Sequence, residues 1–230
     1  MSQWVHPGIR AVVFDAVGTL LFPQPSAPEI YRTLALRQGV ELPAEAIRRQ
    51  FVEAFRIEED ADRANRWITS EQRERDRWRT IVTTTLSVLP DPESAFAELF
   101  DHFALPAAWQ LHEDAECVFR SLGNRGVRIG MGTNYDSRVR SVIAGLPGLA
   151  PLQDRVVVSA AIGFRKPAPE FFQEVARTMG CEPRHVLFVG DDVENDFEGA
   201  SAAGMEAVLL DPRGQSTLPR RIERLRELSA

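Results

Sequence analysis

Near its start the chain reads Ile9-Arg10-Ala11-Val12-Val13-Phe14-Asp15-Ala16-Val17-Gly18-Thr19-Leu20, an apolar run that ends in an aspartate and a polar turn. Short apolar runs bounded by turn residues are typical of buried β-strands. A carboxylate that directly follows such a strand is accessible to a ligand bound at the end of the strand. This stretch therefore predicts a first strand that ends at Asp15, with the Asp15 side chain as a candidate nucleophile.

Four further apolar runs follow the first and alternate with helical patterns. The predicted strands are residues 127–132, 156–158, 186–189 and 207–210, and the predicted helices are about 114–124, 137–144, 169–179 and 196–203. Strands that are apolar throughout are typical of parallel sheets covered on both faces. The expected fold class is α/β, a doubly wound parallel sheet that collects its ligands at the carboxyl ends of its strands.

The segment from Phe22 to Leu111 interrupts this alternation and contains no convincing strand. It carries long amphipathic helical patterns, such as residues 44–56 and 71–86. We expect a helical cap domain of residues 23–111, inserted into a core domain made of residues 1–22 and 112–230. The mixed-charge run 71–77 is expected to be a solvated helix face, and the tail 218–228 an Arg-rich amphipathic helix.

Composition narrows the class of protein. The chain has 230 residues, 44% of them apolar, and a net charge of −6, so it has enough apolar residues for a core and no basic excess for nucleic acid. Two distant cysteines without metal or redox spacing indicate a reducing, cytoplasmic setting. No segment has the length of a membrane span or the pattern of a signal peptide. We expect a small-molecule substrate, no nucleic-acid or membrane partner, and a monomer or homodimer.

Polar residues follow four of the predicted strands, at the edge where ligands collect. They are Asp15, then Thr133-Asn134, then Lys166, and finally Asp191-Asp192 with Asp196 close behind. Lys166 is the only lysine among 27 basic residues, and a planar guanidinium does not replace its compact ammonium. Three aspartates at one edge would repel each other without a divalent cation, and oxygen ligands with room for water favour Mg²⁺. Thr133 and nearby backbone N–H groups could hydrogen-bond a phosphate oxygen.

These motifs, in this order, resemble those of the haloacid dehalogenase superfamily, in the branch with a helical cap inserted after the first strand. The resemblance rests on residues 14–20, 132–134, 165–172 and 189–200, and the last of these motifs is the most specific. It implies a Rossmann-like core and a hydrolase that forms a covalent intermediate on Asp15. By resemblance, Thr133 and Lys166 are catalytic, and Gly18, Thr19, Thr133, Asn134 and Lys166 bind the substrate. The same resemblance implies a Mg²⁺ cofactor held by Asp15, the backbone oxygen of Val17, Asp191 and Asp196.

Val17 departs from the pattern of the family's phosphatases, which carry a second aspartate at this position to protonate the leaving group and to activate water. General acid–base catalysis contributes about 10²–10⁴-fold, so a phosphatase here is expected to be slow or limited to good leaving groups. Asp192 and His112 are the candidate substitutes. We expect a Mg²⁺-dependent phosphatase acting on a small phosphorylated metabolite through an aspartyl phosphate.

Three other chemistries use a similar strand-end carboxylate or site. A 2-haloacid dehalogenase needs no acid at position 17, but that branch is metal-free and lacks the paired acids of Asp191 and Asp192. A catalytically weak protein that binds a metabolite or phosphate is also compatible with Val17. Schiff-base chemistry from a cap lysine, as in phosphonoacetaldehyde hydrolases, is excluded because residues 23–111 contain no lysine.

Overall fold

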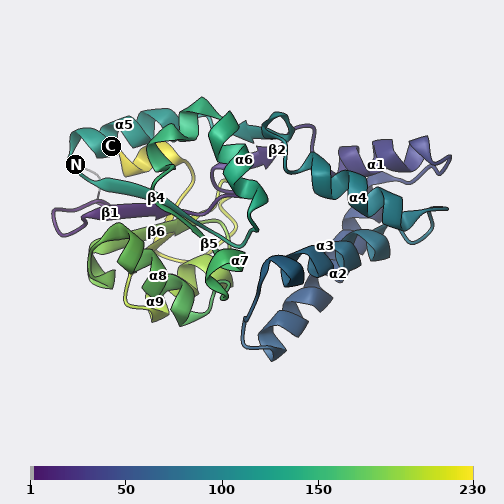
Figure 1. The fold of residues 1–230 in the computed structure, drawn as a ribbon. Helices are drawn as coiled ribbons and strands as arrows, with labels where there is room; N and C mark the ends of the chain where they lie inside the picture. Colours follow the sequence, from purple (N-terminus) through teal and green to yellow (C-terminus); the bar gives the residue numbers. More distant parts are fainter. Residues whose placement is uncertain (1–2, 230) are drawn as a thin grey trace.

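The computed structural model describes residues 3–229 and has a parallel β-sheet at its centre (Figure 1). Within these residues the sheet has six strands in the order β5-β4-β1-β6-β7-β8, and every neighbouring pair is parallel. The strands are β1 Ala11–Phe14, β4 Arg128–Thr133, β5 Val156–Val158, β6 Val186–Gly190, β7 Glu206–Leu210 and β8 Arg221–Ile222. The predicted α/β fold class is confirmed.

Helices cover both faces of the sheet because successive residues of its buried strands point to opposite faces. In β1, Phe14 faces one apolar cluster and meets Phe119 at 5.5 Å between ring centroids, whereas Val13 belongs to a second cluster with Phe171 and Phe172. The helices around the sheet are α5 Ala115–Asn124, α6 Arg138–Gly145, α7 Ser159–Ile162, α8 Pro169–Met179 and α9 Gly199–Ala202. The 3₁₀-helical segments are η1 Pro106–Ala108, η2 Pro147–Leu152, η3 Pro183–His185 and η5 Leu225–Leu228, and η4 Val193–Glu198 is π-helical.

The predicted helix over residues 218–228 is wrong. Arg221–Ile222 forms β8 instead, and the Asp211 N–H donates to the Ile222 carbonyl oxygen at 2.8 Å. The free edge of β7 offers hydrogen-bonding groups that a short tail can satisfy by adding a strand. The leucines that suggested an amphipathic helix, Leu225 and Leu228, are buried from the turn η5.

Four helices lie together to one side of the sheet (Figure 1). They are α1 Ala27–Arg37, α2 Ala44–Ala64, α3 Glu71–Thr85 and α4 Pro92–His102, and they enclose an apolar cluster of their own. Two strands that the sequence did not predict, β2 Leu21–Pro23 and β3 Trp109–Leu111, pair antiparallel where this segment leaves and rejoins the sheet. The described residues contain no helix long and apolar enough to cross a bilayer. The division into core and cap domains at residues 22 and 112 stays a prediction.

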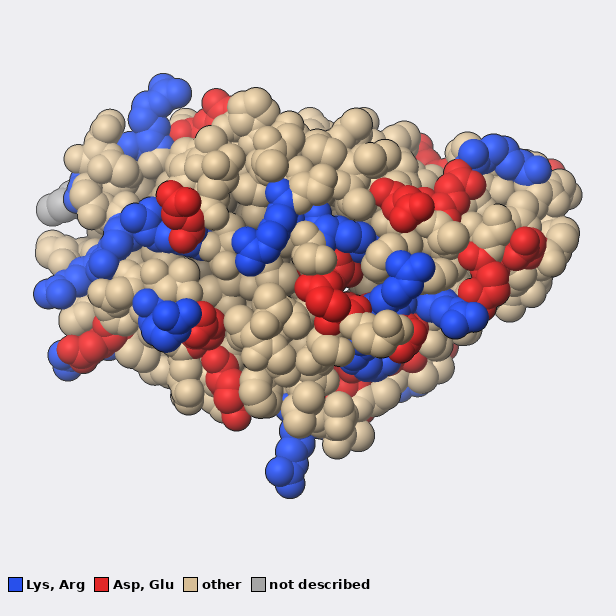
Figure 2. Space-filling model, viewed as in Figure 1, with Lys and Arg blue, Asp and Glu red and all other residues tan. Residues whose placement is uncertain are grey.

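The mixed-charge run on α3 is not wholly solvated, which corrects the prediction for residues 71–77. Figure 2 shows acidic and basic side chains interspersed over α2 and α3 on one face of the molecule, but Glu74 and Arg77 of α3 are each only 1% exposed. The Arg77 guanidinium donates to Asp62 at 2.9 Å and to Glu59 at 2.7 Å. Arg165, which precedes Lys166, also donates to Asp62. We call these five residues the buried ion cluster.

Asp62 is the shared acceptor of this cluster and is fully buried. Truncating Asp62→Ala would leave Arg77 and Arg165 charged and buried without their main partner. Such changes cost about 3–5 kcal/mol, and we expect a loss of this size in the free energy of unfolding, measured by urea denaturation. The control is Asp60→Ala, which removes an exposed partner of Arg56 and should cost less than about 1 kcal/mol. Equal stability of the two variants would contradict the importance of the cluster.

Candidate active site

The carboxyl ends of β1 and β6 place two aspartates beside each other. Phe14 pairs with Val189, and the Asp15 N–H donates to the Val189 carbonyl oxygen at 2.8 Å, so the residues that follow both strands share one edge of the sheet. The chain then turns sharply at Gly18, whose φ of +97° is in the region that favours glycine. A Cβ atom on Gly18 would lie 2.3 Å from Oδ2 of Asp191, so this turn has no space for a side chain.

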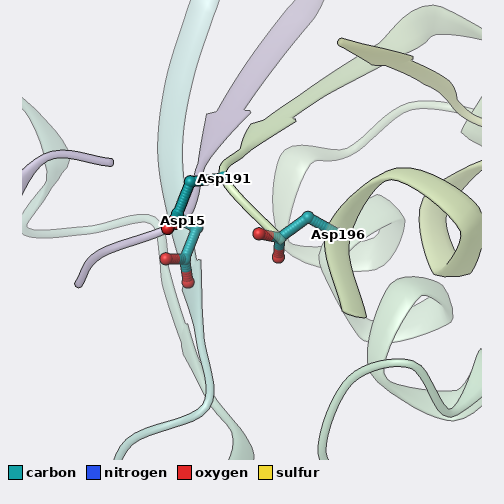
Figure 3. A group of neighbouring side chains, drawn as sticks. All are labelled: Asp15, Asp191 and Asp196. Atoms are coloured by element: carbon teal, nitrogen blue, oxygen red, sulfur yellow. The ribbon is translucent and has the colours of Figure 1, made fainter. Parts of the chain in front are cut away.

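Asp196 completes an acidic cluster with Asp15 and Asp191 (Figure 3). One carboxylate oxygen from each of the three residues lies within 4.8 Å of the others. Asp196 lies on η4 and its carboxylate points toward the other two. A Cβ atom on Gly190 would lie 2.1 Å from Asp196 Oδ2, so a second glycine permits this approach. The Thr19 hydroxyl fixes Asp191 by donating to its Oδ1 at 3.1 Å.

Lys166 lies between two of these acids. Its Nζ donates to Oδ1 of Asp15 and to Oδ1 of Asp196, both at 2.6 Å, and the side chain is buried. The Asn134 amide holds the Lys166 main chain from both sides, since its Oδ1 accepts from the Lys166 N–H at 2.7 Å and its Nδ2 donates to the Lys166 carbonyl at 3.1 Å. Asn134 therefore fixes the segment from which the ammonium reaches Asp15.

The acidic cluster carries more negative charge than Lys166 offsets. Burial raises the pKa of Asp15 to about 8, with Lys166 opposing this shift and Asp196 and Asp191 adding to it. Asp191 as a whole residue is exposed, but desolvation of its carboxyl group, followed by the charge of Asp196, raises its pKa to about 6. Three carboxylates and one ammonium leave two uncompensated negative charges when all are ionised. An all-oxygen donor set with this excess charge fits a divalent cation such as Mg²⁺.

A cavity of about 390 Å³ extends from Asp15 to the helices α1–α4. The end at the sheet is polar and includes Thr133, Asn134 and Lys166, as the sequence predicted. Gly18 and Thr19 do not line it, and their N–H groups donate to the Leu21 and Ala16 carbonyl oxygens. Their expected role in binding a substrate stays a prediction. The Gly18 N–H stabilises the turn, and the Thr19 hydroxyl donates to Asp191.

Val17 lines the cavity and is 40% exposed. The position at which the family's phosphatases carry their second aspartate therefore faces the space that a substrate would occupy. The structure places the two candidate substitutes differently. Asp192 lines the cavity, but its Oδ1 accepts the Asn195 N–H at 2.8 Å as a helix cap. His112 does not line the cavity, and its Nδ1 accepts the Asp114 N–H at 3.1 Å.

The far end of the cavity is aromatic, which the sequence patterns did not predict. Most of these rings are on α2, α3, α4 and the strand β3, and the aromatic lining residues are Tyr31, Phe51, Phe55, Trp78, Phe96, Phe100, Phe103, Trp109 and Tyr135. Their spacing along the helices fits an internal core equally well. Only the packing of the four helices against each other shows which rings face the cavity.

Comparison with known proteins places the chain in a family. The model of the haloacid dehalogenase-like hydrolases matches residues 9–204. The chain is 30% identical over 223 residues to the human haloacid dehalogenase-like hydrolase domain-containing protein 3, covering 92% of this chain and 88% of the relative. It is 28% identical to a ribulose-1,5-bisphosphate 5-phosphatase of Halopiger xanaduensis, over 90% and 86% of the two chains.

Solved structures agree on the fold. The crystal structure of a dehalogenase superposes with a TM-score of 0.74 at 19% identity, over 97% of this chain and 96% of that one. The chain belongs to the haloacid dehalogenase-like hydrolases, and the family resemblance seen in its motifs is confirmed. Relatives that bear phosphatase names are consistent with a hydrolase.

Proposed function

We propose that this hydrolase is a Mg²⁺-dependent phosphatase that transfers the phosphoryl group of a small monoester to Asp15. The observation that carries the proposal is the cluster of Asp15, Asp191 and Asp196 with Lys166 between two of its members. A metal-free carboxylate nucleophile would gain nothing from two further acids beside it. The phosphatase name of the relative from Halopiger xanaduensis supports phosphoryl transfer.

The residues have distinct roles in this proposal. Asp15 attacks phosphorus, and Lys166 orients its carboxylate and favours the ionised form, which opposes the effect of burial on the Asp15 pKa. The Thr133 side chain, at the end of β4, donates to a phosphate oxygen. Mg²⁺ would be held by Asp15, Asp191 and the main-chain oxygen of Val17, with Asp196 in support. When bound, it would offset the negative charge that develops between nucleophile and phosphate. The helices α1–α4 act as a cap that excludes water from the reaction.

Removal of the metal separates this proposal from its rivals. We expect EDTA to lower phosphate release from phenyl phosphate or acetyl phosphate at least about tenfold, because the metal contributes several kcal/mol to charge stabilisation, and added Mg²⁺ to restore it. The same preparation is assayed for halide release from 2-chloropropionate.

The alternatives predict different results in this assay. Halide release that EDTA does not change would identify a dehalogenase, for which Val17 is an adequate residue. Binding of Mg²⁺ and phosphate without turnover of any ester would identify a binding protein. Either outcome would contradict the phosphatase proposal.

A further inference from the structure

We infer that the substrate is the phosphate monoester of a phenol or a larger aromatic alcohol, in which the oxygen that leaves is attached directly to the ring. This inference rests on the proposed phosphatase function and assigns the organic part of its substrate. Three independent observations carry it: the aromatic end of the cavity, the pairing of the cations that line it, and the valine at position 17.

The first observation is the shape and chemistry of the cavity. Phe51 and Phe55 lie one turn apart on α2, with ring centroids 6.0 Å apart and an interplanar angle of 28°. Trp78 of α3 approaches Phe55 at 6.5 Å with an angle of 61°. All three rings line the cavity and are only partly buried, so they retain surface that faces into it. Aromatic rings prefer offset and edge-to-face contacts of this kind with another ring.

The second observation is that the cations beside these rings are already paired. Among the described residues, three arginines line the cavity. Arg77 donates to Asp62 and Glu59, and Arg165 donates to Asp62.

Arg138, the third of these arginines, is held in the same way. It makes two hydrogen bonds to Asp136, at 2.8 and 2.7 Å, and a third to the Phe100 carbonyl oxygen at 2.7 Å. Its guanidinium lies over the Phe100 ring, 3.4 Å from the ring centroid. Lys166 is bound to Asp15 and Asp196. Each described cation of the cavity therefore already has a carboxylate partner, although Nε of Arg165 makes no hydrogen bond. This pairing disfavours bisphosphates and phosphorylated acids, which bring a second anionic group.

The third observation concerns the leaving group. An alkoxide needs a proton as it departs, and the position that would supply one is Val17. A phenol ionises near pH 10, as the tyrosine side chain does, so it departs as a phenolate without a protein acid. An aryl ester therefore brings an aromatic ring to the cavity and also a leaving group that needs no proton from residue 17.

The reaction balances without a further reactant. An Asp15 oxygen forms a bond to phosphorus, the bond from phosphorus to the aryl oxygen breaks, and its electron pair leaves on the phenolate. Water then attacks the phosphorus of the aspartyl phosphate and the bond from phosphorus to the Asp15 oxygen breaks. Inorganic phosphate and free Asp15 are released, and the proton of the attacking water passes to solvent.

The test compares kcat/KM in Mg²⁺ for five substrates. Phenyl phosphate and 1-naphthyl phosphate have both the ring and the good leaving group. 2-Phenylethyl phosphate keeps the ring on an alkoxide, acetyl phosphate keeps a good leaving group without a ring, and glyceraldehyde 3-phosphate has neither. We expect the two aryl phosphates to exceed 2-phenylethyl phosphate and glyceraldehyde 3-phosphate by about 10²-fold or more, the scale of acid catalysis that Val17 does not supply.

Variants of the cavity test the recognition of the ring. We expect Phe55→Ala and the milder Trp78→Phe to lower the ratio of kcat/KM for 1-naphthyl phosphate over acetyl phosphate, by about tenfold for the alanine variant. Val52→Ala is the matched control, because Val52 lies on the same helix, is 60% exposed and does not line the cavity. Circular dichroism checks that all variants are folded.

Each result supports or overturns the inference. A preference for glyceraldehyde 3-phosphate over the aryl esters would overturn it and leave the phosphatase proposal intact. An aryl preference that the Phe55 and Trp78 variants do not change would overturn the assignment of the ring to this cavity. Turnover of none of the five substrates in Mg²⁺ would overturn the phosphatase proposal itself, and the inference with it.

Discussion

The Asp15→Asn variant should lose turnover by a factor on the order of 10⁴ or more, the scale seen when an enzyme loses its nucleophile. An amide has no anionic oxygen to attack phosphorus, and its size is that of the carboxylate it replaces. The fold should survive the change. Burial raises the pKa of Asp15 to about 8, so its charge is costly in the folded protein, and Lys166 keeps Asp196 as a partner.

Phosphate release and thermal denaturation together check this result. A melting temperature near that of the wild type, combined with the loss of turnover, assigns the effect to chemistry. Asp60→Asn serves as the control, since Asp60 is exposed on α2 and pairs with the exposed Arg56. Measurable turnover at more than about 1% of the wild-type rate in Asp15→Asn would show that another group attacks phosphorus.

The Val17→Asp variant should gain activity, by about 10²–10⁴-fold in kcat/KM for alkyl phosphates such as 2-phenylethyl phosphate. Val17 lines the cavity two residues after Asp15 and is 40% exposed, so a carboxyl group at this position meets the leaving oxygen without being buried. The gain for aryl phosphates should be much smaller, because a phenolate departs without a proton.

Rapid mixing tests the second half of the reaction. Hydrolysis of the aspartyl phosphate also lacks a base in the wild type, so we expect one equivalent of phenolate to appear in a burst before slow steady turnover. Val17→Asp should shorten or remove the burst by activating water. The asparagine of Val17→Asn has nearly the same shape as the aspartate of Val17→Asp but does not transfer a proton. The Asn variant should therefore behave like the wild type. An equal gain in the Asn variant would show that polarity, and not proton transfer, limits the enzyme.

The strands of the sheet were predictable because each is recognised from the apolar residues of its own short segment. The runs before Asp15 and Asp191 are apolar throughout, and the run before Thr133 is apolar except for Arg128 at its start, as expected of buried parallel strands. The order of polar residues at their ends then predicted which side chains meet. The structure brings Asp15, Lys166, Asp191 and Asp196 together as that order implied.

Features that depend on distant partners were not predictable in this way. Arg77 looks like any exposed arginine of a charged helix until Asp62, fifteen residues away, becomes its partner in the interior. The strand β8 exists because the edge of β7 was free to receive it. Likewise, the use of Gly18 and Thr19 to hold Asp191 depends on the approach of β6.

The buried ion cluster also bears on how new specificities could be engineered into this enzyme. Asp62 and Glu59 belong to α2, whereas Arg165 belongs to the segment that carries Lys166, and Asn195 of η4 donates to Glu59 at 3.2 Å. The four helices are therefore not an exchangeable module. A chimera that takes these helices from a relative must bring two acids to the same places. A chimera without these acids would leave the Arg165 guanidinium unpaired, one residue before Lys166, whose ammonium contacts Asp15.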